Sequence, residues 1–280
     1  MYLLSMTIRN TTLFELEKKG YSIIQNVIKK KECALLKKKL ETLYKNQKKN
    51  PHFIDEVSHK GQIIIRDLPI RDPDIFLKYS SLNKILAIVG KVFKDKFILD
   101  NMMASNSLSV GNKFDTKVHI DSQLPINSIN FTTDVVVMIC LDNFEVSNGA
   151  TKVWPGSHRS GRRIHHEKNS NVNKKFKYLV APRGSASVLL GQTWHQVGKN
   201  VSHKSRWSIF LHYKRWWMKP STDFTFCGPK IFKKLTTKQK ELFGFTSIPP
   251  RYDFKRKTKK VHTLRKVTSL KKDYKKNFYS

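Results

Sequence analysis

The sequence predicts a mainly β protein with flanking helices. From about Phe97 the apolar residues change from helical to alternating spacing, which is typical of half-buried strands. Turn signals such as Asn148-Gly149 and Pro155-Gly156 separate the short apolar runs. About eight such runs behind a helical N-terminal part favour a double-stranded β-helix of the jelly-roll, cupin-like type. The expected strands are residues 97–107, 114–120, 134–141, 152–154, 178–181, 186–190, 194–197 and 207–213.

The N-terminal part is predicted to hold most of the helices. Gly20 can end the first helix as a C-cap residue, and Ser80-Ser81 can cap the start of a later one. Apolar residues recur at helical spacing from Leu36 to Tyr44 with lysines between them, so this helix has a basic outer face. The expected elements are helices at 13–19, about 36–44 and 82–93, and short strands at 21–28 and 63–65.

The chain is expected to form one domain at residues 1–252, followed by a basic extension at 253–280. A length of 280 residues with 39% hydrophobic residues is enough for one sizeable core. Within the domain we expect a helical prologue at 1–96, a jelly-roll core at 97–218 and a closing segment at 219–252. The extension is rich in Lys and Arg and shows no apolar period, which is typical of a frayed tail.

The formal net charge of +33 admits two interpretations. It can indicate an anionic partner such as nucleic acid, or it can reflect a lysine-rich composition on a solvated surface. Lysine outnumbers arginine, whereas specific phosphate recognition favours arginine forks. The sequence shows no basic motif interleaved with aromatic residues, so nucleic acid is a possible partner but not the favoured one.

Two further features bear on the environment of the protein. No run of 18 apolar residues is present, so no membrane span is expected. Cys33, Cys140 and Cys227 are odd in number and far apart, which fits neither a disulfide framework nor a zinc site. A cytoplasmic location is therefore expected.

The triplet His119-Ile120-Asp121 is the first candidate for chemistry. In a strand, residues i and i+2 face the same side, so His119 and Asp121 can share a metal. His195 follows a predicted strand and a short turn, and taken alone it fits an ordinary core histidine equally well. Two histidines and one carboxylate together match the facial triad of non-haem Fe(II) oxygenases, which leaves metal positions open for a 2-oxo acid and O2.

A 2-oxo acid cosubstrate such as 2-oxoglutarate also needs a cation for its distal carboxylate. Arg206 begins the strand after His195, and arginine can hold a carboxylate with two parallel hydrogen bonds. Ser208 faces the same side and can add a hydroxyl donor. The alternative is an ordinary arginine at a strand edge.

These elements together resemble the phytanoyl-CoA dioxygenase family, a branch of the Fe(II)/2-oxoglutarate oxygenases. The resemblance covers most of the chain, from about Phe14 to Tyr252. The sequence departs from the family at Gly184-Ser185, where the family often has Gly-Asp. The residues that carry the resemblance are His119 and Asp121, the segment from Asn148-Gly149 to Pro155-Gly156-Ser157-His158, and the series His195, Asn200 and Arg206.

The resemblance implies that the protein is an enzyme that uses Fe(II) and 2-oxoglutarate. Fe(II) would be held by His119, Asp121 and His195, and 2-oxoglutarate by Arg206 with Ser208. Conversion of 2-oxoglutarate and O2 to succinate and CO2 would drive hydroxylation of an unactivated C–H bond. The implied substrate is a small metabolite, either anionic or neutral, or an acyl or lipid derivative. The alternatives are a catalytically silent jelly-roll binding protein, and an oxygenase or binding module that acts on nucleic acid.

The segment after the Pro-Gly-Ser-His turn is the candidate for substrate contacts. Arg162, Arg163, His165 and His166 occupy four of five positions and are expected to favour an anionic substrate. His158 is interpreted as a structural residue rather than a fourth ligand, because a further protein ligand would occupy a metal position that the chemistry needs.

Overall fold

A computed structural model describes residues 2–47, 61–108, 117–122, 131–164, 172 and 175–246. The predicted basic extension at 253–280 lies outside these residues. Among the described helices, none combines the length and the hydropathy that crossing a membrane requires.

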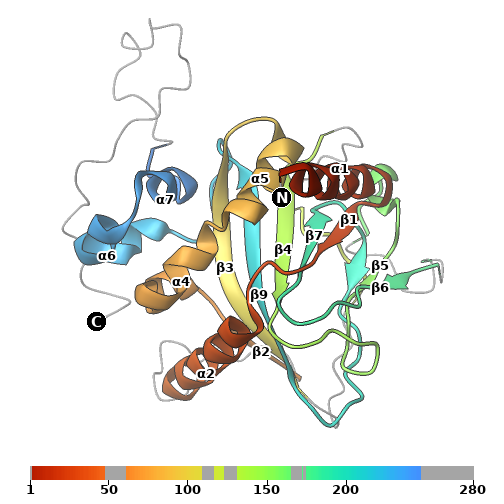
Figure 1. The fold of residues 1–280 in the computed structure, drawn as a ribbon, viewed down its shortest axis with the longest axis horizontal. Helices are drawn as coiled ribbons and strands as arrows, with labels where there is room; N and C mark the ends of the chain where they lie inside the picture. Colours follow the sequence, from red (N-terminus) through yellow and green to blue (C-terminus); the bar gives the residue numbers. More distant parts are fainter. Residues whose placement is uncertain are drawn as a thin grey trace, which may run out of the picture.

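Six antiparallel strands form the larger sheet, in the order β1-β7-β4-β9-β3-β2 (Figure 1). The edge strands β1 and β2 both come from the N-terminal part, so the segment predicted as a helical prologue also completes the sheet. The strands are β1 (Tyr21–Ile24), β2 (Gln62–Ile65), β3 (Phe97–Ser107), β4 (Asp134–Cys140), β7 (Ala186–Leu190) and β9 (Arg206–Arg215).

A smaller sheet faces the larger one. It contains β6 (Lys177–Tyr178), β5 (Lys152–Val153) and β8 (His195–Gln196) in that order. Met138 and Leu189 from the larger sheet pack with Val153 and Leu179 in one buried apolar cluster. Apolar burial between two antiparallel sheets is the jelly-roll architecture that the strand pattern predicts.

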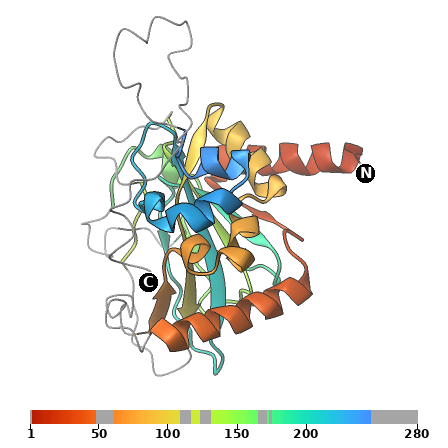
Figure 2. The ribbon, with the colours of Figure 1, turned by 90° about the vertical axis from the view of Figure 1, so that its left-hand side faces the viewer.

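The helices cover the outer face of the larger sheet. The odd-numbered residues of β9 from Trp207 to Tyr213 share one buried cluster with helix residues such as Phe76 and Ile85. Figures 1 and 2 show α4, α6 and α7 on this side, away from β5 and β6. The helices are α1 (Tyr2–Lys19), α2 (Lys30–Gln47), α3 (Leu68–Arg71), α4 (Pro73–Ser80), α5 (Asn83–Phe93), α6 (Gly228–Lys234) and α7 (Thr237–Leu242), with 3-10 turns η2 (Ser157–Arg159) and η4 (Phe224–Cys227).

The predicted and observed elements agree best where the apolar pattern is long. The strands expected at 97–107 and 186–190 have the bounds of β3 and β7. Of the strand expected at 114–120, residues 117–120 are described, and only His119 forms a bridge there. The strands expected at 207–213 and 63–65 are longer in the structure, as β9 and β2, whereas β1, β4, β5, β6 and β8 extend over fewer residues than expected.

The predicted cap of α5 was wrong. Leu82 occupies the N-cap position without a side-chain hydrogen bond. The Ser80 hydroxyl instead donates to the Leu77 carbonyl, 2.7 Å away, within the last turn of α4. The sequence showed no separate helix at 73–80, so the serines were assigned to the wrong helix.

Candidate metal centre and cavity

His119 and His195 are brought together by their backbones. The His119 N–H donates to the His195 carbonyl and the His195 N–H donates to the His119 carbonyl, both at 3.0 Å. This antiparallel bridge places the two side chains next to each other, with ring centroids 4.2 Å apart. One backbone pair therefore brings together two histidines that lie 76 positions apart in the sequence.

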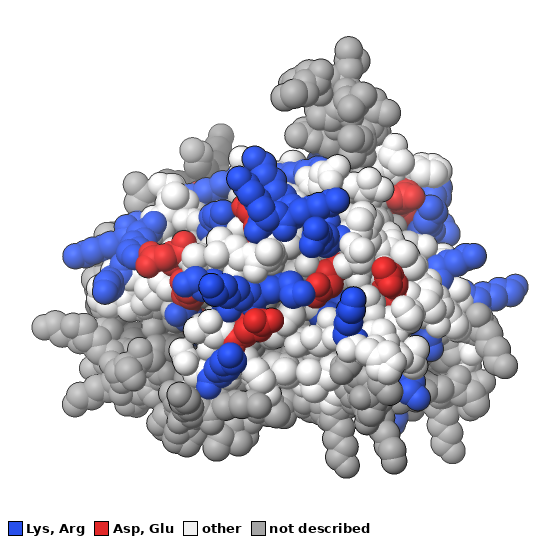
Figure 3. Space-filling view, turned by 60° about the horizontal axis from the view of Figure 1, so that its bottom comes forward, with Lys and Arg blue, Asp and Glu red and all other residues white. Residues whose placement is uncertain are grey.

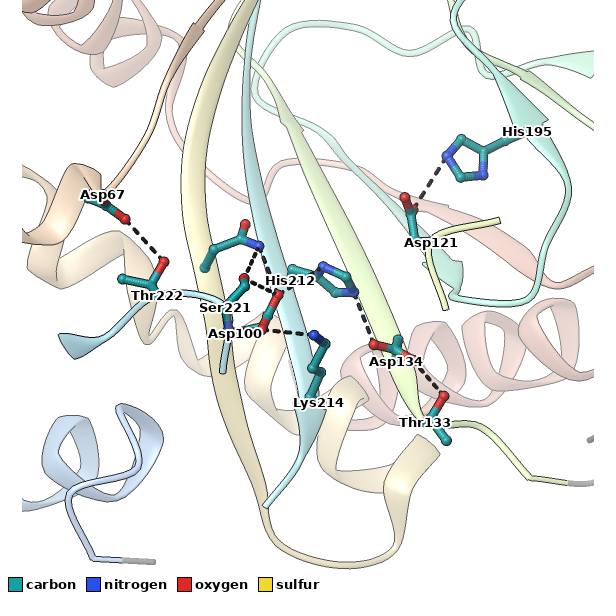
Figure 4. A network of polar contacts seen from close by, with 11 residues as sticks. Asp67, Asp100, Asp121, Thr133, Asp134, His195, His212, Lys214, Ser221 and Thr222 are labelled. Atoms are coloured by element: carbon teal, nitrogen blue, oxygen red, sulfur yellow. Dashed lines mark hydrogen bonds and ion pairs between the residues drawn. The ribbon is translucent and has the colours of Figure 1, made fainter. Parts of the chain in front are cut away.

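Asp121 reaches the same place through Gly191. The backbone N–H groups of Asp121 and Ser122 both donate to the Gly191 carbonyl, at 2.9 Å each. A Cβ at position 191 would lie 2.6 Å from the Asp134 Cβ, so only glycine fits this close approach. Asp121 Oδ2 then lies 3.4 Å from His195 Nε2, and Figure 4 shows the two side chains pointing toward one another.

The three side chains form a group that could hold a metal ion. One ligand atom from each of His119, Asp121 and His195 lies within 4.8 Å of the others. The Nδ1 atoms of His119 and His195 each lie 3.0 Å from a backbone carbonyl, of Lys117 and Thr193 respectively. Because a carbonyl only accepts, Nδ1 carries the proton and the Nε2 lone pair is available for a metal. The donor set and the tautomers fit Fe(II).

The metal group opens into a cavity of about 520 Å³ between the sheets. Val136, Met138, Leu189 and Phe210 give it apolar walls. Such walls exclude water from a reacting centre, which is typical of sites for small molecules. Polar side chains that the sequence analysis did not single out also line the cavity, namely Gln62, Asn101, Ser105, Lys117, Thr151 and His212.

Arg206 lies inside the barrel but does not line this cavity. Its side chain is on the same face of β9 as Phe210 and His212, which do line it. Two of its nitrogens donate to the carbonyls of Asn148 and Gly149, at 3.1 and 2.9 Å, and its guanidinium lies 3.8 Å from the centre of the Phe144 ring.

Among the residues that the structure describes, no carboxylate forms an ion pair with Arg206. Its third nitrogen, Nη1, is buried without a partner among the described residues. Burial lowers the pKa of Arg206 to about 10, so the group stays cationic at neutral pH. Ser208 is buried beside it, and its hydroxyl lies 3.4 Å from the Ser105 carbonyl. A buried cation with an unsatisfied donor fits the carboxylate of a bound 2-oxo acid.

His212 is a histidine of the cavity wall that the sequence analysis did not single out. Its Nδ1 lies 3.3 Å from Asp100 and its Nε2 lies 3.3 Å from Asp134 (Figure 4). Burial lowers the pKa of His212, but the hydrogen bond with Asp134 and the charges of Asp121, Asp134 and Asp100 outweigh burial and raise it. Lys214 pairs with Asp100 at 2.9 Å, so two cations balance two carboxylates. Alternation along β9 puts His212 on the inner face, which was the available signal.

Of the four predicted substrate residues, the structure describes only Arg162 and Arg163. Arg162 and Arg163 are exposed, and the Arg162 guanidinium lies 5.4 Å from the Trp194 ring, next to His195, without lining the cavity. His165 and His166 lie outside the described residues. The role of all four in binding an anionic substrate stays a prediction.

His158 does not join the metal group. Its Nε2 lies 3.1 Å from the Glu17 carbonyl at the end of α1. Gly20 follows that helix with φ of +83°, and a Cβ there would lie 2.5 Å from His158 Nδ1. His158 therefore packs under the C-terminus of α1, where only glycine leaves room for its ring.

The fold and the site together define a class: a jelly roll with a two-histidine, one-carboxylate centre opening into an apolar cavity. The family model described as phytanoyl-CoA dioxygenase matches residues 16–208. The chain therefore belongs to the phytanoyl-CoA dioxygenase family, as its motifs predicted.

Relatives and solved structures agree with the fold. The uncharacterized protein Rv1501 of Mycobacterium tuberculosis is 22% identical over 236 residues, covering 81% of this chain and 84% of that protein. The carbocyclase SnoK from nogalamycin biosynthesis, described as non-haem and α-ketoglutarate-dependent, has a TM-score of 0.63 at 15% identity, over 83% of this chain and 92% of that one. HygX of Streptomyces hygroscopicus, solved with nickel, 2-oxoglutarate and hygromycin B, has a TM-score of 0.62 at 14% identity, over 75% and 88% of the two chains. At these identities the structures show a shared jelly-roll fold.

Proposed function

We propose that this protein is an Fe(II)- and 2-oxoglutarate-dependent oxygenase that hydroxylates an unactivated C–H bond of a small molecule. The observation that carries the proposal is the convergence of donor atoms from His119, Asp121 and His195 within 4.8 Å at the wall of an apolar cavity. Membership of the phytanoyl-CoA dioxygenase family supports it.

The residues have separate tasks in this proposal. His119, Asp121 and His195 hold the metal and leave its remaining positions open. Arg206 holds the distal carboxylate of 2-oxoglutarate through its unpaired Nη1, and Ser208 adds a hydroxyl. When bound, iron and 2-oxoglutarate supply the oxidising chemistry, in which O2 converts 2-oxoglutarate to succinate and CO2. Val136, Met138 and Phe210 keep water from the reacting centre.

A carboxylate ligand favours hydroxylation over halogenation. Asp121 would serve as a ligand where a halide would otherwise bind, so the oxygen outcome is the one proposed. Structures of similar fold are described as an epimerase and a carbocyclase, which shows that the fold supports several outcomes. Mass spectrometry of the product decides: a gain of one oxygen is expected, and a chlorinated, epimerised or cyclised product would contradict hydroxylation.

The basic surface does not change this proposal. Figure 3 shows a face with many Lys and Arg side chains, and Asp and Glu side chains lie among them. Ion pairs such as Lys78 with Glu32 at 3.0 Å neutralise part of the charge locally. The mixture fits a solvated surface as well as an anionic partner, so the surface charge adds no support to the small-molecule proposal.

The test begins with cofactor binding. Under anaerobic conditions the protein should bind one equivalent of Fe(II), and 2-oxoglutarate should then produce a charge-transfer absorption. His195→Ala should lose both signals, whereas His203→Ala should keep them because His203 is exposed and outside the metal group. Succinate release over a metabolite panel then identifies substrates. Wild-type protein that binds neither iron nor 2-oxoglutarate would support the silent binding protein instead.

A further inference from the structure

A second cavity, of about 340 Å³, adjoins the metal cavity. Asn101 and Met103 on β3 line both cavities, so these two side chains form the junction between them. Beyond the junction, all residues that line the second cavity except Phe226 have polar side chains. Arg66, Asp67, Thr222 and Asp223 lie in that wall.

The backbone at Asp67 is held in an unusual conformation there. Asp67 has a φ of +55°, in the left-handed region that non-glycine residues rarely adopt. It stands at the N-cap of α3 but makes no capping hydrogen bond. Its Oδ1 instead accepts a hydrogen bond from the Thr222 hydroxyl at 3.0 Å, across the second cavity's wall (Figure 4). Backbone strain of this kind is maintained where surrounding structure determines it and is enriched at binding sites.

Asp100 joins the polar groups of the two cavities. A β-bulge between Leu99 and Asn101 leaves Asp100 outside the ladder. Its carboxylate contacts His212 in the metal cavity, at 3.3 Å. It also accepts from the Ser221 N–H and hydroxyl, at 2.6 and 2.8 Å, and Ser221 lines the second cavity.

Asn101 leaves an acceptor at the junction. Its Nδ2 donates to Asp100 at 2.8 Å and to the Ser221 hydroxyl at 3.2 Å. Its Oδ1 is buried and has no hydrogen-bond partner within the part of the chain that is described. A buried acceptor without a partner costs free energy, so a ligand hydroxyl at the junction would remove that cost.

We infer that the second cavity binds a hydroxyl-rich, sugar-like part of the substrate while an apolar part lies beside the metal group. This inference rests on the proposed oxygenase function. A polyol presents donors and acceptors together, which complements a wall that holds the side chains of Asp67, Asp223, Thr222 and Arg66. An alkyl chain would leave these groups desolvated, and an anion would meet two carboxylates against one arginine. Phe226 and Met103 supply apolar contact for the C–H surface of such a ring.

Binding of matched probes tests the inference. The probes are phenol and the phenyl glycosides of glucose, galactose, mannose and glucosamine, titrated by NMR into anaerobic protein with Fe(II) and 2-oxoglutarate. At least one glycoside should bind the wild type about ten-fold or more tightly than phenol. Equal or weaker binding of all four glycosides would overturn the inference.

Three variants locate the preference. Asp67→Asn keeps a residue that tolerates positive φ, and Thr222→Val keeps the shape of the side chain, so both should fold. Each should reduce the glycoside preference to about three-fold or less, while Asp74→Asn, an exposed aspartate paired with Lys234, should leave it unchanged. A preference that survives both cavity variants places the sugar elsewhere and overturns the inference. Parallel iron and 2-oxoglutarate titrations separate the two proposals: if these fail in the wild type, the oxygenase function fails first.

Discussion

Asp100 on β3 and His212 on β9 lie 3.3 Å apart, Oδ2 to Nδ1, because a β-bulge turns the aspartate toward the histidine. Leu99 pairs with Tyr213 and Asn101 pairs with His212, so Asp100 is the extra residue of the bulge. With Asp134 on the other ring nitrogen, His212 is held between two carboxylates. Since neutral imidazole has only one N–H, this arrangement favours the imidazolium.

The stability contributed by His212 should depend on pH. Its pKa is raised above the ordinary value of 6.5, so the contribution is fully present below pH 6.5 and is lost as pH rises through the folded-state value. His212→Gln should cost ~3 kcal/mol at pH 6, because it leaves buried carboxylates short of a partner. Urea unfolding of both proteins from pH 6 to pH 10 should show the difference shrinking. A loss of unfolding free energy that does not change with pH, or an equal loss in the control His203→Gln, would contradict a charged His212 in the folded protein.

Asp121 is expected to be needed for iron and not for folding. Mutation of a residue that only orients a metal ligand lowers metal affinity by about 10–100-fold. Asp121→Ala removes a proposed ligand itself, so it should lower Fe(II) affinity by about 100-fold or more. The side chain is only partly buried, so the thermal midpoint without metal should stay within a few degrees. Isothermal titration with Fe(II) and a melting curve check both parts. Iron affinity within three-fold of the wild type would show that other groups hold the metal.

Arg206→Lys should weaken 2-oxoglutarate binding about ten-fold or more. Lysine keeps the charge but loses the fork, and hydrogen bonds to charged groups contribute ~1.5–3 kcal/mol each. Arg215→Lys is the matched control, because Arg215 also lies on β9, contacts Phe131 and donates to backbone carbonyls. Anaerobic titration of 2-oxoglutarate into the iron-loaded proteins measures both. An unchanged affinity in Arg206→Lys would show that another cation holds the carboxylate.

Gly191→Ala should disturb the metal centre without touching a ligand. The new Cβ would lie 2.6 Å from the Asp134 Cβ and 3.1 Å from its carbonyl oxygen, so the backbone must shift. Overpacking of this kind costs ~1–3 kcal/mol. Because the Gly191 carbonyl accepts from the N–H groups of Asp121 and Ser122, iron affinity should fall as well. Ala186→Gly on the same chain segment should weaken stability alone. Normal iron affinity in Gly191→Ala would show that Asp121 is positioned independently.

The basic segment beside the site gives a further prediction. Arg162→Gln combined with Arg163→Gln should raise the Michaelis constant for an anionic substrate, and added salt should remove part of the difference. Deletion of residues 256–280 should leave turnover nearly unchanged. If the deletion abolishes turnover and the two arginine substitutions have no effect, the C-terminal segment and not the arginine pair would be the element that recognises the anionic substrate.

The sequence alone predicted the parts of the fold whose signal is periodic. The alternating runs that became β3 and β7 were expected with the observed bounds, because one face of each packs in the core. The i, i+2 spacing of His119 and Asp121 and the later position of His195 predicted that these three side chains converge, as they do in the structure. The motifs also predicted the family.

The tertiary structure decided what depends on contacts between distant segments. Asp100 becomes a partner of His212 only through a bulge, and alternation in sequence gives no sign of one. The N-terminal strands β1 and β2 become sheet edges because each pairs with a strand more than 30 residues later, at β7 and β3. The second cavity combines Asp67 with Thr222, which are 155 positions apart. Local propensity and spacing are properties of the chain, whereas buried charge partners and cavities exist only after the strands have paired.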